Sequence, residues 1–350
     1  MKDKIEIIDF IKGYSIISIV LFHYCQGMEL PPILSKAINF GGTGIHTFLF
    51  ASGFGLFLSH LRKPLGYGDF LKKRFTKIYI PYIIIVTISA LIALWIPIYE
   101  NNWNNYFSHI FLYKMFDSHL IGTYGYQLWF ISTIVQFYLI FPLIVRARQW
   151  LPGKNFLLTG LLISVAWAFV ILLLNKEGER NWNSFFLMYV WEFMLGMYCA
   201  EMYLKKGIEF WNIKPGWLIF ITVAGLFLYS ALAIQYGRVG RTFNDIPALF
   251  GYASLCILIY RLHIDLINRF ILFTAKISFS IFLIHFLVLN LVLSASAKIG
   301  INSFLISACL SLILCYLISV PLQRFFDYLT GSLLFNSTIP AKTVEPVSGR

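Results

Sequence analysis

Long apolar stretches alternate with short polar segments along the chain, and the apolar stretches have the length of membrane helices. A helix needs roughly 20 mostly apolar residues to cross the hydrocarbon core of a bilayer. Ten stretches approach this length, at about 7–27, 41–59, 78–98, 126–145, 156–174, 185–204, 217–235, 246–262, 277–295 and 303–322. The pattern predicts an all-α polytopic membrane protein with about ten transmembrane helices and a membrane domain over residues 1–328.

The composition agrees with this prediction. Hydrophobic residues make up 59% of the 350 residues, charged residues make up 13%, and the mean hydropathy is +0.74. Ordinary soluble domains are about 25% charged, so these values exclude a disordered chain, a collagen and a disulfide scaffold and argue against a cytosolic enzyme. The five cysteines lie in or beside apolar stretches without metal-type spacing. We therefore expect no metal site and no permanently bound cofactor.

Basic residues are distributed unevenly between the polar segments. If the N-terminus is cytoplasmic, about three quarters of the 28 Lys and Arg residues fall on the cytoplasmic side. The outward segments hold only Lys36, Lys114, Lys176, Arg180, Arg238, Arg241 and Lys298. Because cytoplasmic loops are enriched in Lys and Arg, we expect both termini in the cytoplasm and the protein in the inner or plasma membrane. The net charge of +12 then reflects topology, and nucleic acid is not expected as a partner.

Two polar segments differ from the short connections. Residues 98–125 form the longest outward segment, are rich in Asn, Trp, Tyr and His, and are predicted to form a small extracytoplasmic lid. Residues 329–350 are polar and contain Pro340, Pro346 and Gly349. They are predicted to be a short, disordered cytoplasmic tail.

The first apolar stretch carries three ionisable residues, Asp9, Lys12 and His23. A charge inside a membrane span is costly, so each such residue is a candidate functional residue. At about 100° per residue all three project from one stripe of the helix, and Lys12 and His23 lie some 16–17 Å apart along the axis. We interpret the stripe as a polar path through the membrane. Snorkelling of Lys12, pairing of Asp9 with Lys12 and an interhelical hydrogen bond of His23 are the structural alternatives.

The densest positive charge follows the second apolar stretch, in the segment 72–77. It contains Lys72, Lys73, Arg74 and Lys77. Such a run is typical of a cytoplasmic loop or of binding to anionic lipid. It is also suited to a multiply phosphorylated ligand, because Arg offers bidentate phosphate contacts and Lys offers a point charge.

Further polar residues fall inside other apolar stretches. Glu192 and His285 would be costly facing lipid, so we expect both in the protein interior, either in structural hydrogen bonds or at a functional site. The second stretch contains small residues around Ser52, which allow close helix packing or close approach of a ligand. His46 lies in the same stretch and could face His23.

Together these residues resemble the integral-membrane acyltransferase 3 family. The first helix of that family carries an acidic residue, then Arg, and eleven positions later His; here these positions hold Asp9, Lys12 and His23. The glycine-rich stretch ending at Ser52 resembles the second helix of the family. Arg74 and the Lys77 that follows resemble its Arg-x-x-Arg motif, with Lys in the second place.

Three later segments extend the resemblance to about residue 321. Leu128-Trp129-Phe130 resembles the start of the family's fourth helix, Phe193 and Gly196 fit a later motif, and 277–285 resembles its ISYxIYLxH segment, with His285 at the end. Ser319 stands where the family often has Glu. The resemblance implies an acyltransferase that takes an acyl group, most often acetyl, from cytoplasmic acyl-coenzyme A and delivers it to a hydroxyl of an extracytoplasmic envelope saccharide.

The charge pattern suggests how such a reaction would be arranged. Lys73, Arg74 and Lys77 would hold the phosphates of the donor, with Lys12 lining the path of its pantetheine arm. His23 would act as general base on the acceptor hydroxyl, or would itself be acylated first. Residues expected to line or support the acceptor pocket are Asp9, Ser52, Trp129, Glu192 and His285.

Two other functions are compatible with buried charge in a polytopic protein. A transporter or flippase of a sugar–lipid or anionic solute would suit ten spans, although the sequence has no evident inverted repeat. A structural subunit that binds anionic lipid would show neither acyl transfer nor transport.

Overall fold

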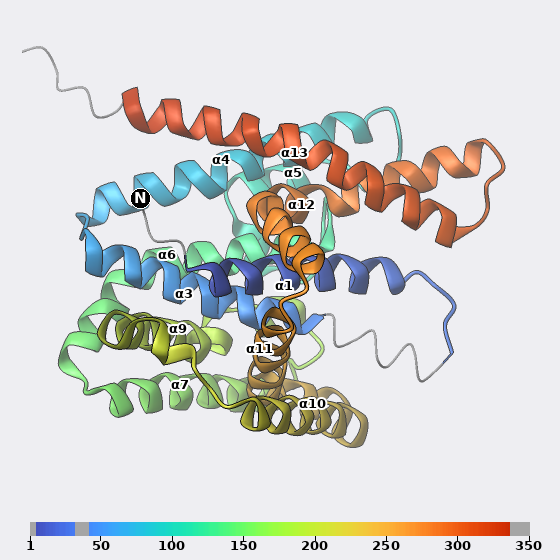
Figure 1. Ribbon diagram of the computed structural model, residues 1–350. Coiled ribbons are helices and arrows are strands. Elements are labelled where there is room, and N and C mark those ends of the chain that lie inside the picture. The colour runs from blue at the N-terminus through green and yellow to red at the C-terminus, as the bar shows by residue number, and fades with distance from the viewer. Residues whose placement is uncertain (1–4, 32–41, 337–350) are drawn as a thin grey trace, which may run out of the picture.

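The computed structural model describes residues 5–31 and 42–336, and these residues form helices joined by short connections (Figure 1). The long helices are α1 (Glu6–Cys25), α3 (Gly44–Arg62), α4 (Tyr67–Ala93), α6 (Trp129–Trp150), α7 (Gly153–Leu173), α9 (Phe186–Lys206), α10 (Pro215–Phe243), α11 (Asp245–Arg261), α12 (Asp265–Lys298) and α13 (Phe304–Asn336). The short helices are α5 (Trp103–Ile110), η2 (Tyr113–Phe116), η3 (Tyr126–Leu128), α8 (Arg180–Asn183) and η4 (Gly207–Trp211). The predicted all-α class is confirmed.

Each predicted apolar stretch corresponds to one long helix, but the number of candidate membrane spans is smaller than predicted. Within the described residues, 8 helices are long and apolar enough to cross a bilayer. Helix α11 has 17 residues, which is short for a span. Helix α9 carries Glu192, Glu201 and two terminal lysines. The length and the charge of these two helices keep them out of the set of eight candidate spans.

Several helices extend beyond the apolar stretches that predicted them. Helix α12 has 34 residues and α13 has 33, because a helix continues past its apolar segment until a residue breaks it. The polar tail expected from residue 329 begins later, since α13 continues to Asn336. The rest of that tail, residues 337–350, lies outside the described residues. Residue 41, the first of the stretch predicted at 41–59, also lies outside them.

The basic run 72–77 was expected in a loop, and this expectation is wrong. Helix α4 begins at Tyr67, so Lys73, Arg74 and Lys77 lie on its first three turns. Pro64 and Gly66 precede the helix, and Asp69 lies in its first turn, where a carboxylate is favourable next to the helix dipole. The segment 67–77 contains no proline, and its Lys, Arg and Leu residues are good helix formers.

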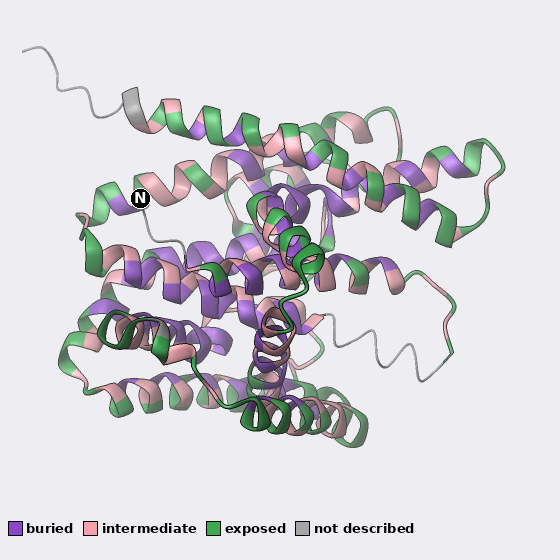
Figure 2. Ribbon diagram, viewed as in Figure 1, coloured by how far each residue is buried: buried purple, intermediate pink, exposed green. Residues whose placement is uncertain are grey.

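The helices enclose a buried centre. Helix α1 packs against α12, α3 and α11, and α3 packs against α9. Figure 2 shows the buried residues gathered on α1, α3, α6 and α9, whereas α7, α10 and α13 turn exposed residues outward. The exposed side chains of these outer helices include Phe220, Leu162 and Ile313. An apolar exterior of this kind is expected where lipid replaces water.

Two glycines set the distance between α3 and α9. A Cβ atom built on Gly53 would lie 2.1 Å from the carbonyl oxygen of Phe193, and one built on Gly196 would lie 2.1 Å from that of Phe50. Close approach of this kind is how small residues join helices in a membrane. The small-residue stretch seen in the sequence therefore serves helix packing at Gly53.

Candidate active site in a central cavity

A cavity of about 720 Å³ lies between the central helices. Its wall is built by α1, α3, α6, α12 and the α10–α11 junction, together with the segment 177–183. Lys12 lines it near the start of α1, and His23 lines it near the end of the same helix. The structure thus brings both ends of the predicted α1 stripe onto the wall of one cavity.

The residues at the Lys12 end follow the sequence expectation in part. Lys12 pairs with Asp9, with 3.7 Å between Nζ and Oδ1. Asp9 does not line the cavity, so its contact is with Lys12. Ser52 and Tyr138 also line the cavity, and Ser52 therefore sits where a ligand could reach it.

His23 lies in an aromatic part of the wall. Its imidazole stacks on that of His285, with ring centroids 5.4 Å apart and planes 24° apart, and it contacts the ring of Phe286. Among the described residues His23 Nδ1 has no hydrogen-bond partner. His285 is fully buried, and its Nδ1 lies 3.1 Å and 3.0 Å from the carbonyl oxygens of Ile281 and Phe282. His285 therefore packs behind His23.

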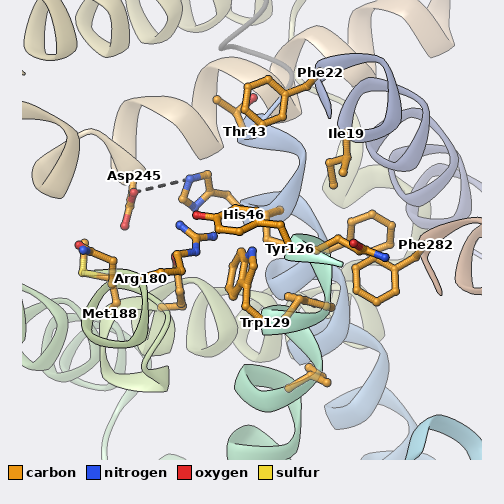
Figure 3. A pocket seen from close by; sticks show the side chains of 18 of the residues that line it. Ile19, Phe22, Thr43, His46, Tyr126, Trp129, Arg180, Met188, Asp245 and Phe282 are labelled. Atoms are coloured by element: carbon orange, nitrogen blue, oxygen red, sulfur yellow. Dashed lines mark ion pairs between the residues drawn. The ribbon is translucent and has the colours of Figure 1, made fainter. Parts of the chain in front are cut away.

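A second histidine lies in a charged part of the same cavity wall. His46, in the first turn of α3, places Nδ1 2.6 Å from Oε1 of Glu192 on α9. His46 Nε2 lies 3.5 Å from Oδ1 of Asp245, the first residue of α11. Glu192 is fully buried behind His46, whereas His46 and Asp245 line the cavity. We call these three residues the charged cluster; Figure 3 shows His46 and Asp245 facing each other across the wall.

Arg180 completes this end of the cavity. Its guanidinium carbon lies 3.7 Å from the ring centroid of Trp129 and 5.6 Å from that of Tyr126. Figure 3 shows Arg180 between Trp129 and Asp245. Trp129 was expected near an acceptor pocket, and it does line the cavity. Its ring also stacks with that of Tyr189, with centroids 6.2 Å apart.

The predicted phosphate-binding residues lie apart from the central cavity. Arg74 lines a second, smaller cavity of about 250 Å³, together with Lys63, His60 and Arg146. Lys73 and Lys77 line neither of these two cavities. The second cavity gathers three cationic side chains from α4, α6 and the residue that follows α3, which gives it the charge needed to hold phosphate groups.

The lid predicted at 98–125 contains α5 and η2. His109 is buried, with Nδ1 2.8 Å from the hydroxyl of Tyr82 and Nε2 2.8 Å from that of Thr123. Lys114 Nζ donates to the carbonyl oxygen of Leu128 at 3.0 Å. Burial lowers the pKa of both His109 and Lys114 well below their ordinary values. The segment is therefore an ordered element with its own buried polar contacts.

The sequence pointed to His46 and Glu192 individually, but it did not reveal that they pair, and it missed Asp245, which lies at the edge of an apolar stretch. Arg180, on the same cavity wall, was considered only as an outward basic residue. The sequence did offer one signal for this part of the site, since basic residues are rare in the outward segments. Three of these rare residues, Arg180, Arg238 and Arg241, line the cavity. Their convergence from α8 and α10 needs the tertiary structure.

Long apolar helices around an internal polar cavity define an integral membrane protein with a buried site. The family model for an acyltransferase domain matches residues 5–321, nearly the whole chain. The chain belongs to the acyltransferase 3 family, which confirms the resemblance found in the sequence, and it is a membrane acyltransferase. No curated protein and no solved structure matches it.

Proposed function

We propose that the protein moves an acyl group, most often acetyl, from cytoplasmic acyl-coenzyme A to a hydroxyl of an extracytoplasmic cell-envelope saccharide. The observation that carries this proposal is the single cavity lined by both Lys12 and His23. These residues lie near opposite ends of α1, about 16–17 Å apart along the helix axis. A separation of this size along the cavity wall suits the thin pantetheine arm of the donor.

The anionic end of the donor is assigned to the cationic side of the bundle. Arg74, Lys63 and Arg146 line the second cavity, and guanidinium groups make bidentate contacts with phosphate. Lys73 and Lys77 share the first turns of α4 with Arg74 and would add to the positive potential there. The positive-inside bias of the sequence favours the cytoplasmic face of the inner or plasma membrane for this side.

His23 is assigned as the general base. In the reaction, the acceptor oxygen attacks the thioester carbonyl, His23 takes the hydroxyl proton, the carbon–sulfur bond breaks, and the proton leaves with the coenzyme A thiol. His23 suits this role because its Nδ1 is unoccupied among the described residues and its ring lines the cavity. A positioned general base supplies roughly 10²–10⁴-fold in rate.

The test uses membranes that contain the protein, radiolabelled acetyl-coenzyme A and an extract of envelope saccharides. Label should appear in the saccharide fraction with the wild type. His23→Ala is expected to lower this transfer at least about 100-fold at equal protein level. The matched control is His119→Ala, which removes an exposed imidazole in the lid. Full transfer by His23→Ala would contradict the assignment of the base.

A further inference from the structure

The charged cluster has no part in the reaction as assigned to His23, and holding the helices together does not explain it. Glu192 lies on α9 and His46 on α3, and these two helices are already joined by the close contacts of Gly53 and Gly196. Burying carboxylates is costly, and apolar residues of similar volume often serve stability as well or better. The cluster is therefore better explained by a ligand than by packing.

The cluster contains two carboxylate oxygens without a hydrogen-bond partner among the described residues, Asp245 Oδ2 and Glu192 Oε2. Of these two residues, Asp245 lines the cavity, whereas Glu192 is buried behind His46. Because Glu192 Oε1 lies at Nδ1 of His46, the imidazole is held with Nε2 toward the cavity side and Asp245. One wall of the cavity thus carries three polar groups. These are the carboxylate of Asp245, the imidazole of His46 and the guanidinium of Arg180.

These groups suit hydroxyls better than a metal ion. The His46, Glu192 and Asp245 ligand atoms lie within 4.8 Å of one another, close enough for a cation. However, Nδ1 of His46 is already committed to Glu192, and the positive charge of Arg180 shares the wall. A saccharide hydroxyl instead both donates and accepts, so it can donate to Asp245 and accept from Arg180.

We propose that the charged cluster is the acceptor subsite: Asp245 and His46 bind hydroxyls of the saccharide, and Glu192 is a positioning residue for His46. This inference rests on the proposed acyltransferase function and locates its acceptor. The subsite lies on the cavity wall with His23, where α1 ends and α3 and α11 begin. A hydroxyl held there can be presented to a thioester that lies along α1.

The experiment measures steady-state kinetics of the purified protein in nanodiscs, with acetyl-coenzyme A as donor. The acceptor probe is the envelope saccharide fraction from cells that lack this protein, after removal of O-acyl groups with mild alkali. Asp245→Asn is expected to raise the apparent KM for this saccharide at least about tenfold, with kcat and the KM for acetyl-coenzyme A changed less than about threefold. Glu192→Gln, which keeps an oxygen toward His46, should raise the same KM less.

Asp265→Asn is the matched control, because Asp265 is also the first residue of a helix but is exposed. It should leave both KM values unchanged. If Asp245→Asn does not fold, His46→Gln takes its place with the same expected split. An unchanged acceptor KM in a folded variant would overturn the acceptor subsite while leaving the acyltransferase function intact. The same conclusion would follow if the wild-type protein held one metal ion per chain and the Asp245→Asn variant lost it. Absence of transfer by the wild type would overturn the proposed function itself.

Discussion

The two histidines of the central cavity lie in opposite surroundings. His23 stacks on His285 and contacts Phe286, with no carboxylate within ion-pair distance among the described residues. His46 lies between Glu192 and Asp245, with Arg180 on the same wall. The first imidazole has one ring nitrogen without a hydrogen-bond partner among the described residues, whereas the second is held in one orientation by its neighbours.

This difference separates two tasks that a group-transfer site must perform. A general base has to change its protonation state during the reaction, and a partner-free nitrogen permits that change. A binding group has to keep its orientation, and a carboxylate hydrogen-bonded to the far side of an imidazole fixes that orientation. On this view the aromatic wall performs the chemistry and the charged wall holds the acceptor.

After the loss expected for His23→Ala, the next largest effect is expected from separating α3 from α9, the two helices that carry His46 and Glu192. Gly53→Val places side-chain atoms where Phe193 backbone atoms lie, and such overpacking costs about 1–3 kcal/mol of stability. Because His46 and Glu192 lie on these two helices, transfer to the acceptor should fall more than about tenfold. Thermal unfolding in detergent and the transfer assay measure the two effects.

Gly55→Val is the control for this prediction. Gly55 lies two residues further along the same helix, and an added Cβ meets nothing within 4 Å. Equal losses in the two variants would show that valine in α3, rather than the helix contact, causes the defect.

A smaller effect is expected at the donor side, which serves His23 and not the charged wall. Arg74→Ala removes a guanidinium from the second cavity and should raise the KM for acetyl-coenzyme A about tenfold, because a hydrogen bond to a charged group contributes about 1.5–3 kcal/mol. The acceptor KM should not change. Arg62→Ala, at the exposed end of α3, serves as control; a donor KM unaffected by Arg74→Ala would remove Arg74 from the phosphate site.

The smallest effect is expected from mild acid acting on the segment 98–125. Burial lowers the pKa of His109, so this segment takes up a proton when it unfolds locally that it cannot hold when folded. Local stability of the segment therefore falls as the pH drops through the ordinary histidine value of about 6.5. Hydrogen exchange of residues 103–116, corrected for its intrinsic pH dependence, should quicken a few-fold between pH 7 and pH 6.

His109→Asn supplies a side chain that does not titrate and sharpens the lid prediction. In this variant, the part of the increase in hydrogen exchange at low pH that is due to His109 should disappear. Lys114 is also held with a lowered pKa, and its contribution has the same sign, so some pH dependence should remain. Slower exchange in acid would contradict the argument.

The sequence allowed the helical class and the positions of the long helices to be predicted, because lipid selects apolar stretches of fixed length. Lys12 and His23 could be placed on one face because both lie on one helix with a regular period. The charged cluster could not be found in this way. His46, Glu192 and Asp245 come from three helices, and their convergence depends on close glycine contacts that hydropathy does not encode.

The measurement that tests the central claim most directly separates donor and acceptor by a membrane. Proteoliposomes with the protein inserted in one known orientation receive radiolabelled acetyl-coenzyme A only on the Arg74 side and de-O-acylated saccharide only on the Arg180 side. The proposed mechanism, in which a donor bound on the Arg74 side reaches His23 in the central cavity, predicts labelled saccharide with the wild type and at least about 100-fold less with His23→Ala. Transfer only when both substrates are on the same side, or full transfer by His23→Ala, would contradict the account.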